Sequence, residues 1–160
     1  MTAETTPTSP AEILRQNLTR GFALPGACVE WLLDIWETIQ TLDDYADGDP
    51  VSRERLDALI WRTLVGLPGN AWFAQNAGQM IPALAAMVLK WQASDRAERA
   101  GEADARSFVW RAGYYDLVLM AVLLTHGEEA ARRVAHLVMH LYGERLEDYL
   151  AEFKQGGDHA

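Results

Sequence analysis

Residues 26–49 read GACVEWLLDIWETIQTLDDYADGD, and this stretch decides the fold class. It shows no alternation of polar and apolar residues with a period of two, which a half-buried strand would require. A helix is therefore predicted from about Ala27 to about Tyr45, followed by a turn at residues 47–50. The rest of the chain has the same character, because the helix-favouring residues Ala, Leu, Glu, Arg and Met dominate it.

Capping residues and breaks place the other helices. Ser9 and Pro10 begin the first helix, Ser52 caps a later one, and Asp104 caps another. Because the connections are short, neighbouring helices are expected to pack antiparallel around one core. The predicted fold is all-α: a single-domain antiparallel helical bundle of about six helices over residues 9–154, with flexible segments at 1–8 and 155–160. The predicted helices besides 27–45 are 10–20, 53–65, 71–78, 81–99, 104–126 and 128–153.

The composition excludes several classes of protein. The 160 residues include 14 basic and 23 acidic side chains, and the net charge of −9 disfavours binding to a phosphate backbone. The same charge suits cations or a basic protein partner. Cys28 is the only cysteine, which excludes an internal disulfide, and its apolar surroundings predict a small core residue rather than a nucleophile. The six tryptophans are expected mainly in the core.

The sequence carries no recognisable targeting or membrane segment. Residues 1–9 lack the features of a signal peptide, and the most apolar run, 113–124, is too short to span a bilayer. We therefore expect a cytoplasmic protein with no membrane partner and no direct nucleic-acid binding, and a homodimer is compatible with the sequence. Glycine-rich phosphate loops and the serine-hydrolase elbow are absent from it.

The acidic face of the 27–45 helix is the strongest functional feature. Glu30, Asp34, Glu37 and Asp44 are spaced, through Thr41, at steps of three and four, so they share one helix face without a lysine or arginine. Further acids crowd the C-terminal end, where the helix dipole disfavours each by roughly 0.3–1 kcal/mol. A divalent cation, Mg²⁺ or Mn²⁺, is the natural compensator, because hard oxygen ligands suit these ions. The predicted metal ligands are Asp44 and Asp47, supported by Asp43, Glu37 and Asp34.

Simpler explanations compete with this metal site. Asp-Gly-Asp-Pro is ordinary turn chemistry, and acids on a surface helix are frequent in a protein of this charge. The segment from Asp43 to Glu54 has the length of an EF-hand calcium loop. However, Tyr45 and Pro50 stand where that loop needs a carboxylate ligand and a backbone donor.

Asp43-Asp44-x-x-Asp47 resembles the aspartate-rich motif of terpenoid and prenyl-diphosphate synthases. In that all-helical family a helix end presents carboxylates to Mg²⁺ ions that hold a substrate diphosphate, and the resemblance implies this role here. It covers residues 34–49, and the second metal motif of the family is not present. Asp34-x-x-Glu37 and Asp44-x-x-Asp47 are more distantly similar to the paired motifs of all-helical nucleotide pyrophosphatases, in which the two motifs lie on separate helices.

Other helices offer candidate partners for the acidic face. Asp116 interrupts an apolar segment and is predicted to be a further ligand or a base, because a buried carboxylate is costly unless paired. A salt bridge to an arginine elsewhere is its structural alternative. Arg111 or Arg62 would bind a phosphate bidentately, and Asn76 would hydrogen-bond a substrate or close a turn.

The last predicted helix adds His136 and His140, which are four residues apart and so able to share a metal, with Glu144 four residues further on. Taken together, these features predict a Mg²⁺-dependent enzyme that acts on a small molecule bearing a diphosphate. The alternative is a non-catalytic helical interaction or assembly protein whose acidic face binds a basic partner. Residues 67–82 resemble small helical proteins of phage or prophage origin, which would make the alternative a phage-derived protein.

Overall fold

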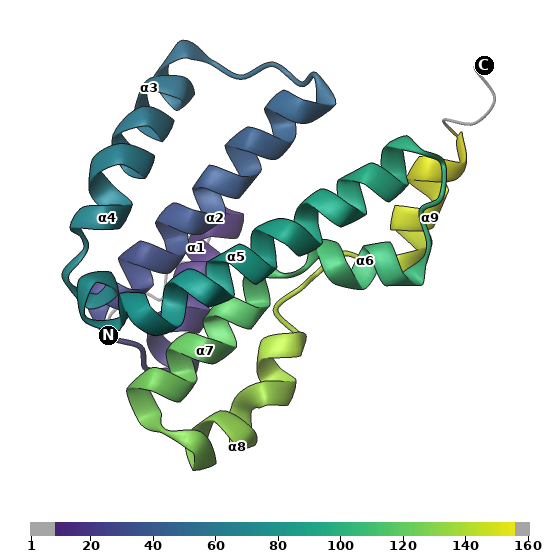
Figure 1. The fold of residues 1–160 in the computed structure, drawn as a ribbon. Helices are drawn as coiled ribbons and strands as arrows, with labels where there is room; N and C mark the ends of the chain where they lie inside the picture. The colour runs from purple at the N-terminus through teal and green to yellow at the C-terminus, as the bar shows by residue number, and fades with distance from the viewer. Residues whose placement is uncertain (1–8, 156–160) are drawn as a thin grey trace, which may run out of the picture. The chain divides into compact units, whose positions relative to one another are not determined.

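The computed structural model describes residues 9–155, so the segments 1–8 and 156–160, predicted to be flexible, lie outside the described residues. The described chain is helical and contains no strand, and the prediction of an all-α fold is confirmed (Figure 1). The chain divides into two compact units, a first unit up to residue 77 and a second from residue 78, and each is described by itself. The single domain over 9–154 stays a prediction.

The first unit is built around one long helix. It contains α1 (Pro10–Gln16), α2 (Gly26–Asp47), α3 (Arg53–Trp61), α4 (Leu67–Gly69) and the beginning of α5 (Ala71–Arg99). Two π-helical turns, η1 (Asn17–Gly21) and η2 (Arg62–Gly66), continue α1 and α3. The long helix α2 contacts α1, α3 and η2, and α3 runs beside it in Figure 1.

Local chemistry explains where these helices begin and end. The Ser9 hydroxyl accepts a hydrogen bond from the Glu12 amide at 3.2 Å, and the Ser52 hydroxyl accepts one from the Arg55 amide at 3.2 Å. Both predicted caps are therefore confirmed. Gly48 ends α2 with φ of 81°, a left-handed conformation that glycine adopts without a Cβ clash.

Aromatic packing holds the beginning of α5 against α2. Trp31 is 1% exposed, and its ring stacks on Phe73 with ring centroids 5.0 Å apart. The Trp72 ring centroid lies 5.8 Å from that of Trp31. Asn70 fixes this junction twice. Its side-chain oxygen caps α5 by accepting from the Phe73 amide at 3.0 Å, and its amide donates to the Ala27 carbonyl at 2.8 Å.

The second unit contains the remainder of α5, then α6 (Ala105–Arg111), α7 (Tyr114–His126), α8 (Glu128–Met139) and α9 (Leu146–Gln155). Asp104 caps α6 in a reciprocal capping box with Ser107. Between α6 and α7, Gly113 permits close approach of α5, because a Cβ there would lie 3.3 Å from Cγ of Met87. Within residues 9–155 no single helix is long and apolar enough to cross a bilayer, although the bent pair α6 and α7 would satisfy length and composition together.

The predicted extents of the helices were wrong in three places. The helices predicted at 71–78 and 81–99 are one helix, α5, which tolerates Pro82 in its interior while burying Met80 and Met87. The helix predicted at 104–126 is broken at residues 112–113, where Gly113 lies close to Met87 of α5. The helix predicted at 128–153 ends at Met139 and resumes at Leu146, so the loop around Gly143 separates α8 from α9.

Candidate functional site

The acidic face of α2 is compensated by arginines from other segments of the first unit. Arg15 forms a two-pronged ion pair with Glu30, in which Nη2 lies 3.1 Å from Oε2. Arg62 donates from Nε to Asp34 Oδ1 at 3.2 Å. Because these arginines lie 15 and 28 residues from their partners, the spacing along α2 gave no sign of them. Arginines of the same unit therefore balance part of this face, for which the sequence predicted a divalent cation as the compensator.

The C-terminal half of this face has its own arginine. Arg55 of α3 donates from Nη1 to Asp44 Oδ2 at 2.7 Å, and its Nη2 lies 3.4 Å from the Thr41 hydroxyl. Thr41 is buried and donates to the Glu37 carbonyl at 2.9 Å. Asp44 is thus held by a neighbouring helix, and the acids that follow it reach the exposed end of α2 at Asp47.

Ion pairing changes the acidity of this face where the contact is closest. The hydrogen bonds from Arg15 hold the pKa of the Glu30 carboxyl below its ordinary value, and they raise the pKa of Arg15. Both side chains are about half exposed, so solvent screens the interaction and its contribution to stability is small.

A cavity of about 500 Å³ opens along the N-terminal half of the acidic face. Asp34 and Glu37 line it together with Arg15 and Arg62, so carboxylates and guanidinium groups meet in one place. Glu37 is half-buried, and no side chain of the described residues pairs with its carboxylate. The remaining lining residues are Ser9, Ala11, Glu12, Glu30 and Leu33.

The predicted metal ligands do not form a closed metal cage. Among residues 9–155, no three His, Cys, Asp or Glu side chains come together in an arrangement that could hold a metal by themselves. Asp34 and Glu37 share the cavity with Arg62, whereas Asp43, Asp44 and Asp47 lie further along α2 and do not line it.

Asp116 and Arg111 belong to the second unit and bind different partners. Asp116 was expected to be buried, but its side chain is 60% exposed and accepts from Lys90 Nζ of α5 at 2.5 Å. Its apolar neighbours Leu117 and Val118 turn to the core instead. The expected structural salt bridge therefore exists, with a lysine in place of an arginine.

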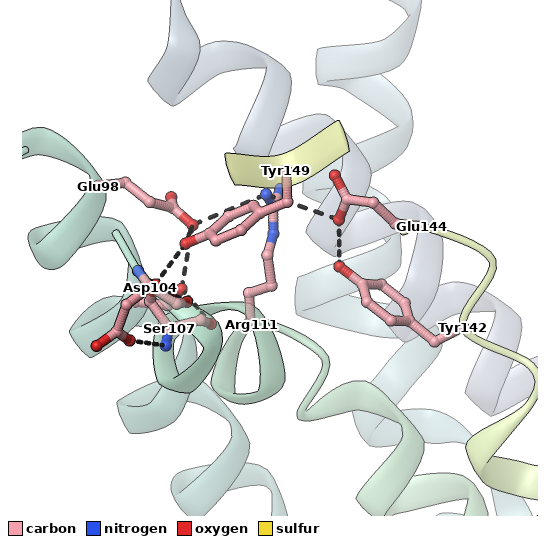
Figure 2. A network of polar contacts seen from close by, with 8 residues as sticks. Glu98, Asp104, Ser107, Arg111, Tyr142, Glu144 and Tyr149 are labelled. Atoms are coloured by element: carbon pink, nitrogen blue, oxygen red, sulfur yellow. Dashed lines mark hydrogen bonds and ion pairs between the residues drawn. The ribbon is translucent and has the colours of Figure 1, made fainter. Parts of the chain in front are cut away.

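Arg111 is the centre of a half-buried polar network (Figure 2). Its Nη1 lies 3.7 Å from Glu98 and 3.8 Å from Glu144, and its guanidinium stacks over the Tyr149 ring at 5.2 Å. Two carboxylates from different segments thus share one cation. The Tyr142 hydroxyl donates to Glu144, and burial together with that carboxylate raises the pKa of Tyr142.

The other predicted residues have local roles. Asn76 donates to the Trp72 carbonyl at 2.8 Å within α5. Cys28 is buried, and burial raises the pKa of its thiol to about 12, which agrees with a core residue rather than a nucleophile. His136 and His140 lie in and just after the last turn of α8, but Glu144 lies in the loop beyond, so the three do not continue along one helix.

No family model, curated protein or solved structure matches this chain. Its function is therefore inferred from the side chains that meet within each unit.

Proposed function

We propose that the chain is a Mg²⁺-dependent enzyme that acts on a diphosphate-bearing small molecule, bound in the cavity of the first unit. The observation that carries the proposal is the meeting of Asp34 and Glu37 with Arg15 and Arg62 in that cavity. A magnesium diphosphate has both kinds of charge, so it needs carboxylates for the ion and guanidinium groups for the phosphates.

The absence of a three-ligand cage among the described residues agrees with this ligand. Mg²⁺ usually keeps several waters and is bound through one or two carboxylates plus the substrate phosphates. Asp34 and Glu37 lie three residues apart on α2, which places both on the same helix face. When bound, Mg²⁺ neutralises phosphate oxygens and lowers the pKa of a coordinated water.

The arginines of the cavity have donors to spare for a phosphate. Arg62 uses Nε for Asp34, and a guanidinium carries five N–H donors in all. Its side chain is 19% exposed, so a phosphate bound there is partly shielded from water and salt.

This proposal moves the centre of the site along α2. Asp44 lies seven residues beyond Glu37, about 10 Å along the helix at ~1.5 Å per residue, and cannot share an ion with it. Asp43, Asp44 and Asp47 would instead raise the local concentration of cations at the exposed end. Catalytic roles for Asp116 and Arg111, and a substrate contact for Asn76, stay predictions.

Thermal unfolding with four additions tests this function: buffer, Mg²⁺, pyrophosphate, and both together. A ligand that binds only the folded state raises Tm, so Mg²⁺ and pyrophosphate together should raise it more than the sum of the two alone. Glu37→Gln should remove most of that increase. Asp49→Asn, which removes an equal charge from an exposed position of the same unit, should keep it.

If Mg²⁺ with pyrophosphate leaves the wild-type Tm unchanged, or if both variants respond equally, the cavity does not bind this ligand. A positive result would be followed by measuring phosphate or pyrophosphate release from nucleoside and isoprenoid diphosphates.

The non-catalytic alternative is favoured by a different observation. Large apolar side chains are exposed along α3 and η2, with exposed fractions of 55% for Ile60, 68% for Trp61 and 71% for Leu64. Exposed apolar side chains gathered in this way are typical of protein interaction surfaces. An interaction protein with an acidic face should bind a lysine-rich polypeptide in a salt-dependent way and show no joint response to Mg²⁺ and pyrophosphate.

A further inference from the structure

The second unit contains a separate cavity that the proposed function does not use. It has a volume of about 390 Å³, which lies within the range of roughly 300–1,000 Å³ typical of small-molecule sites. Apolar residues of α6, α7 and α8 form most of its wall. Its polar and aromatic members are Lys90, Phe108, Tyr115, Asp116, Tyr142 and Glu144.

Three aromatic rings line this cavity one after another. The Phe108 and Tyr142 ring centroids are 5.3 Å apart, and those of Tyr115 and Tyr142 are 5.7 Å apart. The hydroxyls of both tyrosines already have acceptors, since Tyr115 donates to the Leu141 carbonyl and Tyr142 donates to Glu144. The hydroxyl protons are therefore used, and a ligand meets the rings and the hydroxyl oxygens, which can still accept from an N–H donor.

The charges around the cavity do not cancel. Lys90 and Asp116 neutralise one another across 2.5 Å. Glu144, however, shares Arg111 with Glu98, so two carboxylates face one guanidinium (Figure 2). The five side chains together carry a net charge of −1. Of the two carboxylates that share Arg111, Glu144 lines the cavity, and it accepts a hydrogen bond from Tyr142 beside the aromatic rings.

We propose that this cavity binds a small organic cation, an amine with an apolar body. Aromatic faces attract ammonium groups through the ring quadrupole, and the effect is strongest where water is excluded. The unbalanced carboxylate favours the same charge, and the apolar wall accommodates the body of the ligand. A carboxylate ligand is disfavoured, because the lysine of the cavity is already paired and the remaining charge would repel it.

Phenethylamine tests the proposal against two ligands of similar shape, neutral 2-phenylethanol and anionic 3-phenylpropionate. Binding is followed by the NMR signal of the Met139 methyl group, since Met139 lines the cavity and is 66% exposed. We expect phenethylamine to shift this signal and to bind at least five-fold tighter than the alcohol, with the carboxylate weakest.

Two variants with matched charge changes locate the effect. Asp116→Asn removes a carboxylate from the cavity and leaves Lys90 unpaired, so it should weaken phenethylamine binding about five-fold. Asp95→Asn removes a carboxylate from an ion pair of the same unit outside the cavity and should leave binding unchanged. Tyr115→Leu, which removes one ring, should weaken binding as well.

Equal or tighter binding of 3-phenylpropionate overturns the proposal, as does a Met139 signal that stays in place at millimolar phenethylamine. Equal losses in Asp116→Asn and Asp95→Asn would also overturn it, because they would show a general effect of charge. The NMR spectrum reports at the same time whether each variant is folded. None of these readouts depends on Mg²⁺ or on diphosphate chemistry.

Discussion

Removing the hydroxyl group of Tyr149 should measurably destabilise the second unit. Tyr149 is fully buried, and its hydroxyl lies 2.8 Å from Glu98 Oε1 and 2.6 Å from Ser107 Oγ. The single proton can serve only one acceptor at a time, and the carboxylate is the stronger one. A hydrogen bond to a charged group contributes roughly 1.5–3 kcal/mol. We therefore expect Tyr149→Phe to lower the free energy of unfolding by about 2 kcal/mol.

Thermal unfolding followed by circular dichroism measures this change. For a chain of this size ~1 kcal/mol corresponds to about 2–4 °C, so Tm should fall by about 4–8 °C. Amide hydrogen exchange in α9 should accelerate, since Tyr149 connects α9 to α5 and α6. Tyr45→Phe is the control, because Tyr45 is 70% exposed and its hydroxyl has no hydrogen bond within the described part of the chain. A Tm for Tyr149→Phe within 1 °C of that control would refute the reasoning.

Three further predictions use other contacts. Gly113→Ala should lower the free energy of unfolding by about 1 kcal/mol, because the new Cβ would meet Met87. Gly78→Ala adds a Cβ in open space within α5 and should raise the free energy of unfolding by roughly 0.5–1 kcal/mol. Urea unfolding should show these opposite signs. Asn70→Ala should lower it by about 1–2 kcal/mol through loss of the α5 cap, and an unchanged urea midpoint would contradict this. Burial raises the pKa of Tyr149 in the folded protein. The stability that this group contributes is therefore fully present below its unfolded pKa near 10, and it is lost as pH rises through its folded pKa. Alkaline titration should show a shallower loss in Tyr149→Phe.

Features that depend only on residues close together in the sequence could be predicted. Ser9, Ser52 and Asp104 all cap helices as expected, because a cap depends only on residues three positions away. The all-α class follows from the same local preferences. The break at Gly113 was not predicted from local preferences, and it lies where the chain comes close to Met87, 26 residues earlier.

The candidate site shows the same division. The acidic stripe of α2 is evident from its spacing, and the sequence predicts Arg62 as a possible phosphate ligand. The ion pairs of Asp34 with Arg62 and of Asp44 with Arg55 could not be predicted, because these arginines come from segments that only the fold brings near. Asp116 was expected in the core because its sequence neighbours are apolar, but one face of α7 takes those neighbours inward and leaves the carboxylate outside.

The π-helical turn η2 decides how the first unit responds to a deletion in this segment. A π-turn holds one residue more than an α-turn, so it absorbs the extra residue and keeps the helix beyond it in phase. Deleting one residue between 63 and 66 should therefore restore an uninterrupted α-helix with Asn70 still directed to the Ala27 carbonyl. Deleting a second residue would rotate everything after it by about 100°, and α5 would lose its anchor on α2. Among natural variants of this chain, the loss of one residue within η2 should therefore be tolerated far better than the loss of two.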